Sequence, residues 1–185
     1  MSTRTSARPA SARPSQTVRR RNPLVLPAIV VVTAAMMGGG WYLAHPSVPQ
    51  LGQTFASQGQ EHITLGAPHA PYNSYPPTSG PHTAEVAPWG VSQQPIAQET
   101  LIHNLEHGGI VIQYRPGLDS YALQSLADLA AKFPSKIVVV PNAQLKSALA
   151  VTAWTHLLSL DKFDPDLVNR FVGLYKDKAP EFFPD

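Results

Sequence analysis

Two histidines and a glutamate stand close together in the stretch T-L-I-H-N-L-E-H-G-G, residues 100–109, and these residue types can bind a metal ion. His103 and His107 are four residues apart, so their side chains share one face of a helix and would also share one face of a strand. Imidazole nitrogen binds Zn²⁺ at about 2.0–2.1 Å, and it also suits Cu²⁺. The pair therefore predicts a site in which two imidazoles point the same way.

A third ligand has to come from another part of the chain, and His82 is the natural candidate. It ends the stretch T-S-G-P-H, in which Gly and Pro favour a tight turn. Glu106 can serve as a further ligand, hold a ring N–H, or act as a base on metal-bound water. We therefore predict a metal site made of His82, His103, His107 and Glu106, with His62, His69 and His156 as reserve donors.

The cysteine and methionine content of the sequence limits which metals could bind. The chain has no cysteine, and its three methionines are Met1, Met36 and Met37. The part of the chain that holds the histidine site therefore offers neither thiolate nor thioether, which disfavours a resident Cu(I) ion. Imidazole and carboxylate suit Cu(II) or Zn(II), and we expect one of these two as the cofactor.

Two other interpretations of the same residues stay open. In the first, the imidazoles donate to loop carbonyls and pin the proline-rich segment 67–90 to the sheet, while aromatic residues of that loop contact a protein partner in the cell envelope. In the second, H-x-x-E-H at residues 103–107 is the inverted zinc-peptidase motif, and Glu106 is the base of a metal-dependent hydrolase. Gly108 and Gly109 would end a helix directly after the motif, which argues against a peptidase. We favour a non-enzymatic protein with no catalytic residue.

The elements that must position these residues indicate an α+β domain. Short apolar stretches predict strands at Ile110–Tyr114, Ile137–Val140 and Ala148–Leu160, with a further short strand at Glu61–Leu65. Helical spacing or capping signals predict helices over Tyr121–Phe133 and after Asp164-Pro165, with a short helix or irregular turn at Glu99–His107. The expected fold is a small sheet of three to four strands with two main helices, preceded by a single transmembrane helix.

The chain before this domain has a different composition. Residues 1–22 carry six Arg and no acidic residue, and we expect a disordered basic tail. Residues 23–44 contain an uncharged apolar stretch that is long enough to cross a bilayer core of about 30 Å, so we expect a transmembrane anchor there. Residues 45–60 are interpreted as a linker and 61–185 as the domain. The positive-inside rule places the tail in the cytoplasm and the domain outside, with a cleaved signal peptide as the alternative.

The formal net charge of +2 does not indicate a nucleic-acid partner. Beyond the basic tail, the chain keeps eight of its 14 Lys and Arg residues and all 12 acidic residues, which gives that part a net charge of −4. The positive charge is explained by a tail that flanks a membrane span. We therefore expect the membrane as a partner and no nucleic acid.

Four sequence blocks resemble one bacterial family: Y-N-S-Y-P-P-T-S-G-P-H (72–82), A-P-W-G-V (87–91), L-I-H-N-L-E-H-G-G-I-V-I-Q-Y-R-P (101–116) and A-V-T-A-W (150–154). They are similar to the family called domain of unknown function 3105, over about Glu61 to Glu181. The resemblance implies a single-pass protein of a bacterial plasma membrane with this domain outside. It also implies that the two histidine-bearing blocks occur together, which suits a shared site, but it implies no activity.

Overall fold

A computed structural model describes residues 50–181 of the chain. The tail expected at 1–22 and the membrane span expected at 23–44 lie outside the described residues. Within residues 50–181, no helix combines the length and the apolar character needed to cross a membrane.

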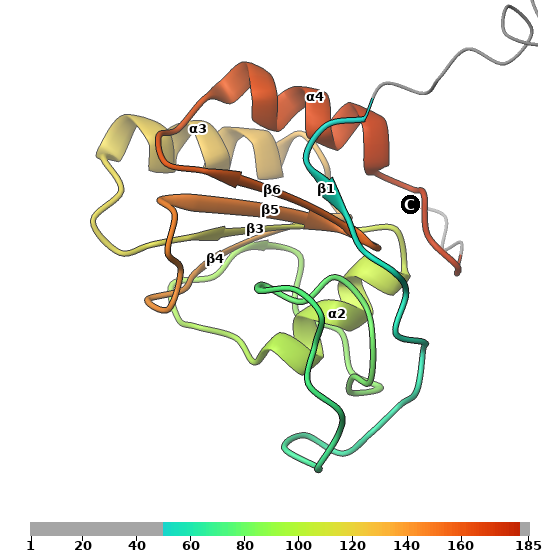
Figure 1. Cartoon of the computed structure of the whole chain (residues 1–185). Helices are drawn as coiled ribbons and strands as arrows, with labels where there is room; N and C mark the ends of the chain where they lie inside the picture. Colours follow the sequence, from blue (N-terminus) through green and yellow to red (C-terminus); the bar gives the residue numbers. More distant parts are fainter. Residues whose placement is uncertain (1–49, 182–185) are drawn as a thin grey trace, which may run out of the picture. The chain divides into compact units, whose positions relative to one another are not determined.

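A mixed sheet of six strands forms the centre of the described domain (Figure 1). In spatial order the strands are β1 (Gln53–Thr54), β6 (His156–Leu160), β5 (Leu149–Ala153), β3 (Ile110–Tyr114), β4 (Ile137–Pro141) and β2 (Gly90–Val91). Strand β4 runs parallel to its neighbours β3 and β2, and the other neighbouring pairs are antiparallel. The α+β class is confirmed, but the prediction of three to four strands is wrong.

The extra strands have two physical origins. Strands β1 and β2 have two residues each, which is too short for an alternating pattern to show in the sequence. The stretch Ala148–Leu160, predicted as one strand, forms the two antiparallel strands β5 and β6. The chain reverses at Thr155, which has a φ of +61°, and the backbone N–H of Thr155 donates to the carbonyl of Thr78 at 2.9 Å.

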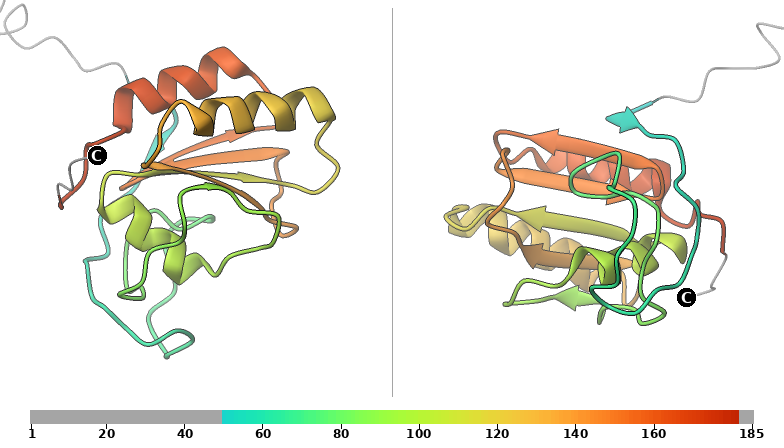
Figure 2. Two further views of the ribbon diagram at one scale, coloured as in Figure 1. Left: turned by 180° about the vertical axis from the view of Figure 1, so that it is seen from behind. Right: turned by 60° about the horizontal axis from the view of Figure 1, so that its bottom comes forward.

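The described residues contain three helices: α2 (Gln98–Glu106), α3 (Ser120–Ala131) and α4 (Pro165–Tyr175). Helices α3 and α4 are the two that were predicted as main helices, and they cover one face of the sheet (Figures 1 and 2). The segment interpreted as a short helix or irregular turn is the helix α2, which lies against the opposite face together with the long irregular segments. The sheet is therefore covered on both sides.

Aspartate side chains begin both main helices. The carboxylate of Asp119 accepts from the backbone N–H of Ala122 at 2.9 Å at the start of α3. The carboxylate of Asp164 accepts from Leu167 N–H at 3.0 Å, and Pro165 occupies the first helical position of α4. These contacts satisfy N–H groups that have no partner within their own helix. The predicted starts of both helices are confirmed.

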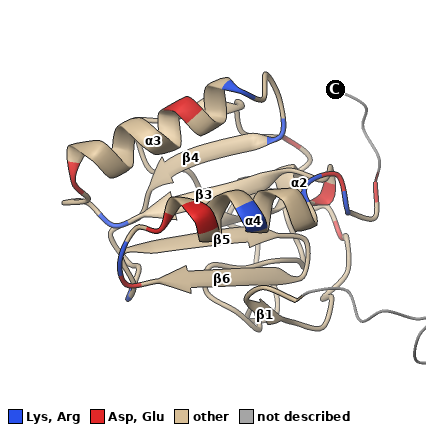
Figure 3. Cartoon of the chain, turned by 90° about the horizontal axis from the view of Figure 1, so that it is seen from above, with Lys and Arg blue, Asp and Glu red and all other residues tan. Residues whose placement is uncertain are grey.

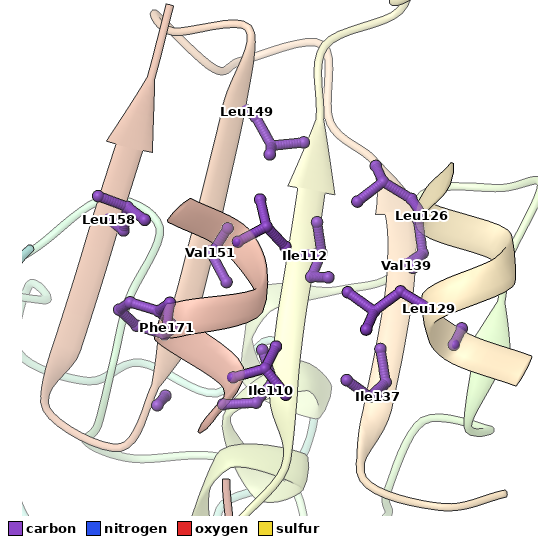
Figure 4. Packing of buried hydrophobic residues seen from close by; sticks show 14 of the residues in the cluster. Ile110, Ile112, Leu126, Leu129, Ile137, Val139, Leu149, Val151, Leu158 and Phe171 are labelled. Carbon is purple, nitrogen blue, oxygen red and sulfur yellow. The ribbon is translucent and has the colours of Figure 1, made fainter. Parts of the chain in front are cut away.

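Apolar side chains fill both faces of the sheet. On the side of α3 and α4, Ile110 and Ile112 of β3 pack with Leu126 and Phe171 (Figure 4). On the side of α2, Val111 packs with residues such as Leu101 and Leu105 of that helix. Strands that are covered on both faces are mainly apolar, which explains the sequence of β3 and β4. The buried exception is Gln113 of β3, whose side-chain amide bonds to that of Gln98 in α2.

Charged residues lie on the helices and connecting segments, as Figure 3 shows. None of the six strands contains Asp, Glu, Lys or Arg. A charged residue in the interior of this domain therefore has to come from a helix or a loop. Glu106, at the end of α2, is such a residue, since it is 1% exposed.

Two glycines end α2 and turn the chain into β3. Gly108 has a φ of +78°, which favours glycine, and the Gly109 N–H donates to the carbonyl of Asn104 at 2.8 Å. A Cβ added at Gly109 would lie 2.6 Å from that same carbonyl oxygen and 2.7 Å from the ring of Trp89. The helix ends at Glu106, His107 is its C-cap residue, and the glycine pair follows directly, as predicted.

The proline-rich segment 67–90 has almost no regular structure, yet much of it is buried. Thr78, Ser79 and His82 are each 0% exposed. Asn104 of α2 clamps the later part of the segment, because its side-chain amide both accepts from Ala87 N–H and donates to Ala87 C=O, each at 2.8 Å. This segment therefore has a fixed position beside α2.

Candidate metal centre

Four side chains from three segments converge beneath the sheet. We call His62, His82, His103 and Glu106 the inner cluster. Each offers one ligand atom, and these atoms all lie within 4.8 Å of one another. His103 and Glu106 come from α2, His82 from the proline-rich segment, and His62 from the segment between β1 and that loop. The structure thus contains a His/Glu group that could hold a metal ion.

His82 is oriented by the backbone of its own turn. Its Nδ1 lies 2.7 Å from the carbonyl oxygen of Gly80, and a carbonyl oxygen can only accept. Nδ1 must therefore carry a hydrogen, so in the neutral ring the lone pair is on Nε2. That nitrogen lies 3.0 Å from Oε2 of Glu106.

His103 repeats this arrangement from the helix. Its Nδ1 donates to the carbonyl of Thr83 at 2.7 Å, so its neutral ring also carries the lone pair on Nε2. Nε2 lies 3.9 Å from Oε2 of Glu106. Metal-binding histidines usually donate their other ring nitrogen to a carbonyl or carboxylate, which fixes the ring and its tautomer. Both buried histidines have that second contact already.

His62 completes the group from the solvent side. Its Nε2 lies 3.6 Å from Oε2 of Glu106, and its side chain is 48% exposed. The strand predicted at Glu61–Leu65 is reduced to a single bridge between His62 and His82, in which Ile63 N–H donates to the His82 carbonyl at 2.7 Å. The ring of His62 stacks on that of His103, with centroids 5.0 Å apart.

Glu106 is the centre of the inner cluster. One carboxylate oxygen, Oε2, faces the Nε2 atoms of all three histidines. The other oxygen, Oε1, is buried and has no hydrogen-bond partner among the described residues. Removing a carboxylate oxygen from water without a partner is unfavourable, so this atom calls for an explanation.

The distances in the inner cluster fit the first shell of a small cation. Four ligands at about 2.0–2.1 Å in a tetrahedral arrangement lie about 3.3–3.4 Å from one another. Oε2 of Glu106 lies 3.0 Å from the Nε2 of His82, 3.6 Å from that of His62 and 3.9 Å from that of His103. The distances from Glu106 to the three histidines are thus close to this separation, and all four donor atoms lie within 4.8 Å of one another.

His107, a predicted ligand, lies next to the inner cluster and is not part of it. Its Nε2 is 3.0 Å from Nε2 of His103 and 3.4 Å from Oε2 of Glu181. It belongs to a second group with Glu106 and Glu181. Burial and the neighbouring His103 lower the pKa of His107 below its usual range, against a smaller opposing effect of Glu181. His107 therefore stays neutral to lower pH than an ordinary histidine.

The two other reserve histidines lie outside both groups. Nδ1 of His69 donates to the carbonyl of Ala70 in its own loop at 2.8 Å. His156 stacks on Tyr175 with ring centroids 4.1 Å apart. Of the reserve donors, only His62 joins the predicted residues. Its sequence context gives no signal for this, because it precedes His82 by 20 residues without a shared motif.

Residues 65–183 match the family described as Protein of unknown function (DUF3105). No curated protein and no solved structure matches the chain. Because the match covers most of the chain, including His82, His103 and Glu106, this protein belongs to the DUF3105 family.

Proposed function

We propose that this domain binds a transition-metal ion through His62, His82, His103 and Glu106, and that it does so without catalysing a reaction. Its role would be to bind, sense or deliver Cu(II) or Zn(II). The observation that carries the proposal is the buried Glu106, which faces three imidazole nitrogens with one oxygen and leaves the other oxygen without a partner.

Hydrogen-bond chemistry supports an ion at this point. With Nδ1 of His82 bound to a carbonyl, its neutral ring presents a lone pair to an ionised Glu106, and two acceptors then face each other at 3.0 Å. Such a contact is repulsive unless a proton or a cation lies between the two atoms. A divalent cation would satisfy His82 and His103 at once, as well as the charge of Glu106.

A structural role for the histidines is the second candidate, and specific contacts favour it. The ring of His82 is bonded to Gly80 and that of His103 to Thr83, so both rings hold the proline-rich loop against α2. In this case a proton lies between His82 and Glu106, and the domain would act as an interaction module of the cell envelope.

A hydrolase is less well supported. Three imidazoles and one carboxylate fill a tetrahedral coordination sphere, whereas catalytic zinc sites keep one position open for water or substrate. Glu106 is 1% exposed and lies against His82, so it is not placed as a free base beside a substrate.

We further propose that residues 23–44 anchor the protein in a bacterial plasma membrane, with the domain outside. The support is the uncharged apolar stretch and the arginine-rich tail before it. Retention of the full chain in the membrane fraction after carbonate washing would test this proposal. Release into the soluble fraction would contradict it.

Calorimetric titration of the protein with Zn²⁺ and Cu²⁺ tests the metal site. We expect a tightly bound ion in the wild type and a loss of affinity of about 10-fold or more in Glu106→Gln, because the amide is a far weaker ligand than the carboxylate. His69→Ala, a histidine substitution outside the inner cluster, is the matched control and should bind like the wild type.

Thermal unfolding with and without zinc separates the metal site from the structural role. In Glu106→Gln the new amide can donate to the lone pair on Nε2 of His82, so the metal-binding account expects an unfolding temperature close to the wild type without zinc and a smaller rise on adding zinc. If zinc raises the unfolding temperature of neither the wild type nor the variant, the metal proposal fails and the structural role replaces it.

A further inference from the structure

A second set of donor atoms lies beside the inner cluster and shares one residue with it. We call Glu106, His107 and Glu181 the outer group; each offers one ligand atom, and the three atoms lie within 4.8 Å of one another. We propose that the outer group is a second divalent-cation site and that the carboxylate of Glu106 bridges the two ions. This inference rests on the proposed function, since Glu106 also belongs to the inner cluster.

The C-terminal segment is held in place for such a site. Oε2 of Glu181 lies 3.4 Å from Nε2 of His107, close to the separation of about 3.3–3.4 Å between two ligands of one tetrahedral ion. The backbone also fixes the segment, because Glu181 N–H donates to the Glu106 carbonyl at 3.2 Å and Asp177 N–H to the Gly108 carbonyl at 2.9 Å. Glu181 is thus positioned by more than its contact with His107.

The unpartnered oxygen of Glu106 leaves this carboxylate able to bind a second ion. Oε2 faces the nitrogens of the inner cluster, and Oε1 is buried without a hydrogen-bond partner among residues 50–181. A carboxylate can bind one ion through each oxygen, and ions bridged in this way are about 3.5–4 Å apart. The two sets of nitrogens are adjacent, since Nε2 of His103 and Nε2 of His107 are 3.0 Å apart.

The local charges permit a second cation. The cationic side chain of Lys136 is engaged beside the group: its Nζ donates to the His107 carbonyl at 2.7 Å and lies 3.7 Å from Oδ1 of Asp177. Lys176 also pairs with Asp177. Glu106 and Glu181 supply two negative charges to the outer group. One imidazole and two carboxylates suit Zn(II) or a harder ion such as Mn(II).

The hydrogen bonds predict an order of loading. Nε2 of His103 is an acceptor, so in the ion-free protein His107 donates its Nε2 hydrogen to it. An ion in the inner cluster takes the lone pair of His103 and breaks this bond. His107 can then carry its hydrogen on Nδ1 and offer Nε2 beside Glu181. The outer ion therefore binds after the inner one. It also binds more weakly, because its ligand Glu181 is 45% exposed to competing water.

Zinc titration of the full chain, followed by native mass spectrometry, tests the outer site. We expect two zinc ions per wild-type chain, bound in sequence. Glu181→Gln should keep the first ion with unchanged affinity and bind the second about 10-fold more weakly or not at all. Asp128→Asn, an acidic residue of α3 outside both groups, is the control and should bind two ions.

The outcomes distinguish this inference from the proposed function. One ion in both wild type and Glu181→Gln overturns the outer site and leaves the inner one standing. No ion in either protein overturns the proposed function and the inference together. Loss of both ions in a folded Glu181→Gln variant overturns the assignment of Glu181 to a separate site.

Discussion

At the scale of single residues, the tautomers of the histidines decide what the site can do. The carbonyls of Gly80 and Thr83 hold Nδ1 of His82 and His103, and this leaves both Nε2 lone pairs facing the inner cluster. If His82 and His103 merely filled space, their two rings would not need the same tautomer. The backbone of the proline-rich loop thus orients both nitrogens as a metal ion would require.

His62 gives the sharpest test at this scale. Its side chain is 48% exposed, so His62→Ala should change the free energy of unfolding of the ion-free protein by less than about 0.5 kcal/mol. The loss of one ligand should nevertheless weaken zinc binding about 10-fold or more. Chemical denaturation and zinc titration measure the two quantities.

The control for His62→Ala is His69→Ala, which removes an exposed imidazole outside the inner cluster. Equal zinc affinities in the two variants would contradict the placement of His62 in the site. Strong destabilisation of the ion-free protein by His62→Ala alone would instead indicate a structural role for that ring.

The sequence predicted much of the site but not all of it. The i, i+3 and i, i+4 spacing on a helix brings His103, Glu106 and His107 to one region. The contribution of His62 depends on pairing between two irregular segments, which no periodicity reports. The side chain of His107 turns toward Glu181, a residue 74 positions later, and local spacing cannot foresee that contact.

At the scale of elements, the end of α2 controls the site because Glu106 is its last residue. The helix must stop there so that β3 can begin at Ile110, and only a small residue fits at Gly109. The apolar sequence of β3 and the caps of α3 and α4 were readable from the sequence. The two-residue strands and the turn at Thr155 were not, because they depend on tertiary contacts.

Substituting Gly109 by alanine should destabilise the domain by about 1–3 kcal/mol, since the new Cβ would meet the Asn104 carbonyl at 2.6 Å. Because the displaced backbone carries Glu106, zinc affinity should fall as well. Gly173→Ala is the matched control: its Cβ meets nothing within 4 Å, and it should stabilise α4 by about 0.5–1 kcal/mol. Denaturant unfolding measures the free energy of unfolding of both variants. Equal effects would contradict the close packing around Gly109.

Tyr72 reports on the attachment of the proline-rich loop at high pH. Its hydroxyl donates to the Pro81 carbonyl at 2.5 Å, and burial, with a smaller effect of Glu99, raises the pKa of Tyr72 to about 12. The folded protein thus holds this proton more tightly than the unfolded chain, whose tyrosines titrate near pH 10. The stability contributed by Tyr72 should be complete below pH 10 and decline as the pH rises toward 12.

Ultraviolet absorbance of tyrosinate measures this titration in the folded protein. The substitution Tyr72→Phe should remove from the wild-type titration one tyrosine that titrates near pH 12. Loss of a component that titrates near pH 10 would show instead that the Tyr72 hydroxyl is exposed to solvent and does not hold the loop.

At the scale of the whole domain, an ion in the inner cluster would join three segments that are distant in sequence. His62 precedes the proline-rich loop, His82 lies in its buried part, and Glu106 ends α2. An ion that binds only the folded state adds about 2.7 kcal/mol of stability when its free concentration is 100 times its dissociation constant. Zinc should therefore raise the unfolding temperature of the whole domain.

The central claim is tested most directly by zinc X-ray absorption on the full chain loaded with one equivalent of Zn²⁺. The inner cluster predicts four ligands at about 2.0–2.1 Å, with the scattering of three imidazole rings and one oxygen. In Glu106→Gln this first shell should change, whereas in His69→Ala it should not. A six-coordinate shell dominated by water oxygens, or one with fewer than two imidazoles, would contradict the assignment of the site.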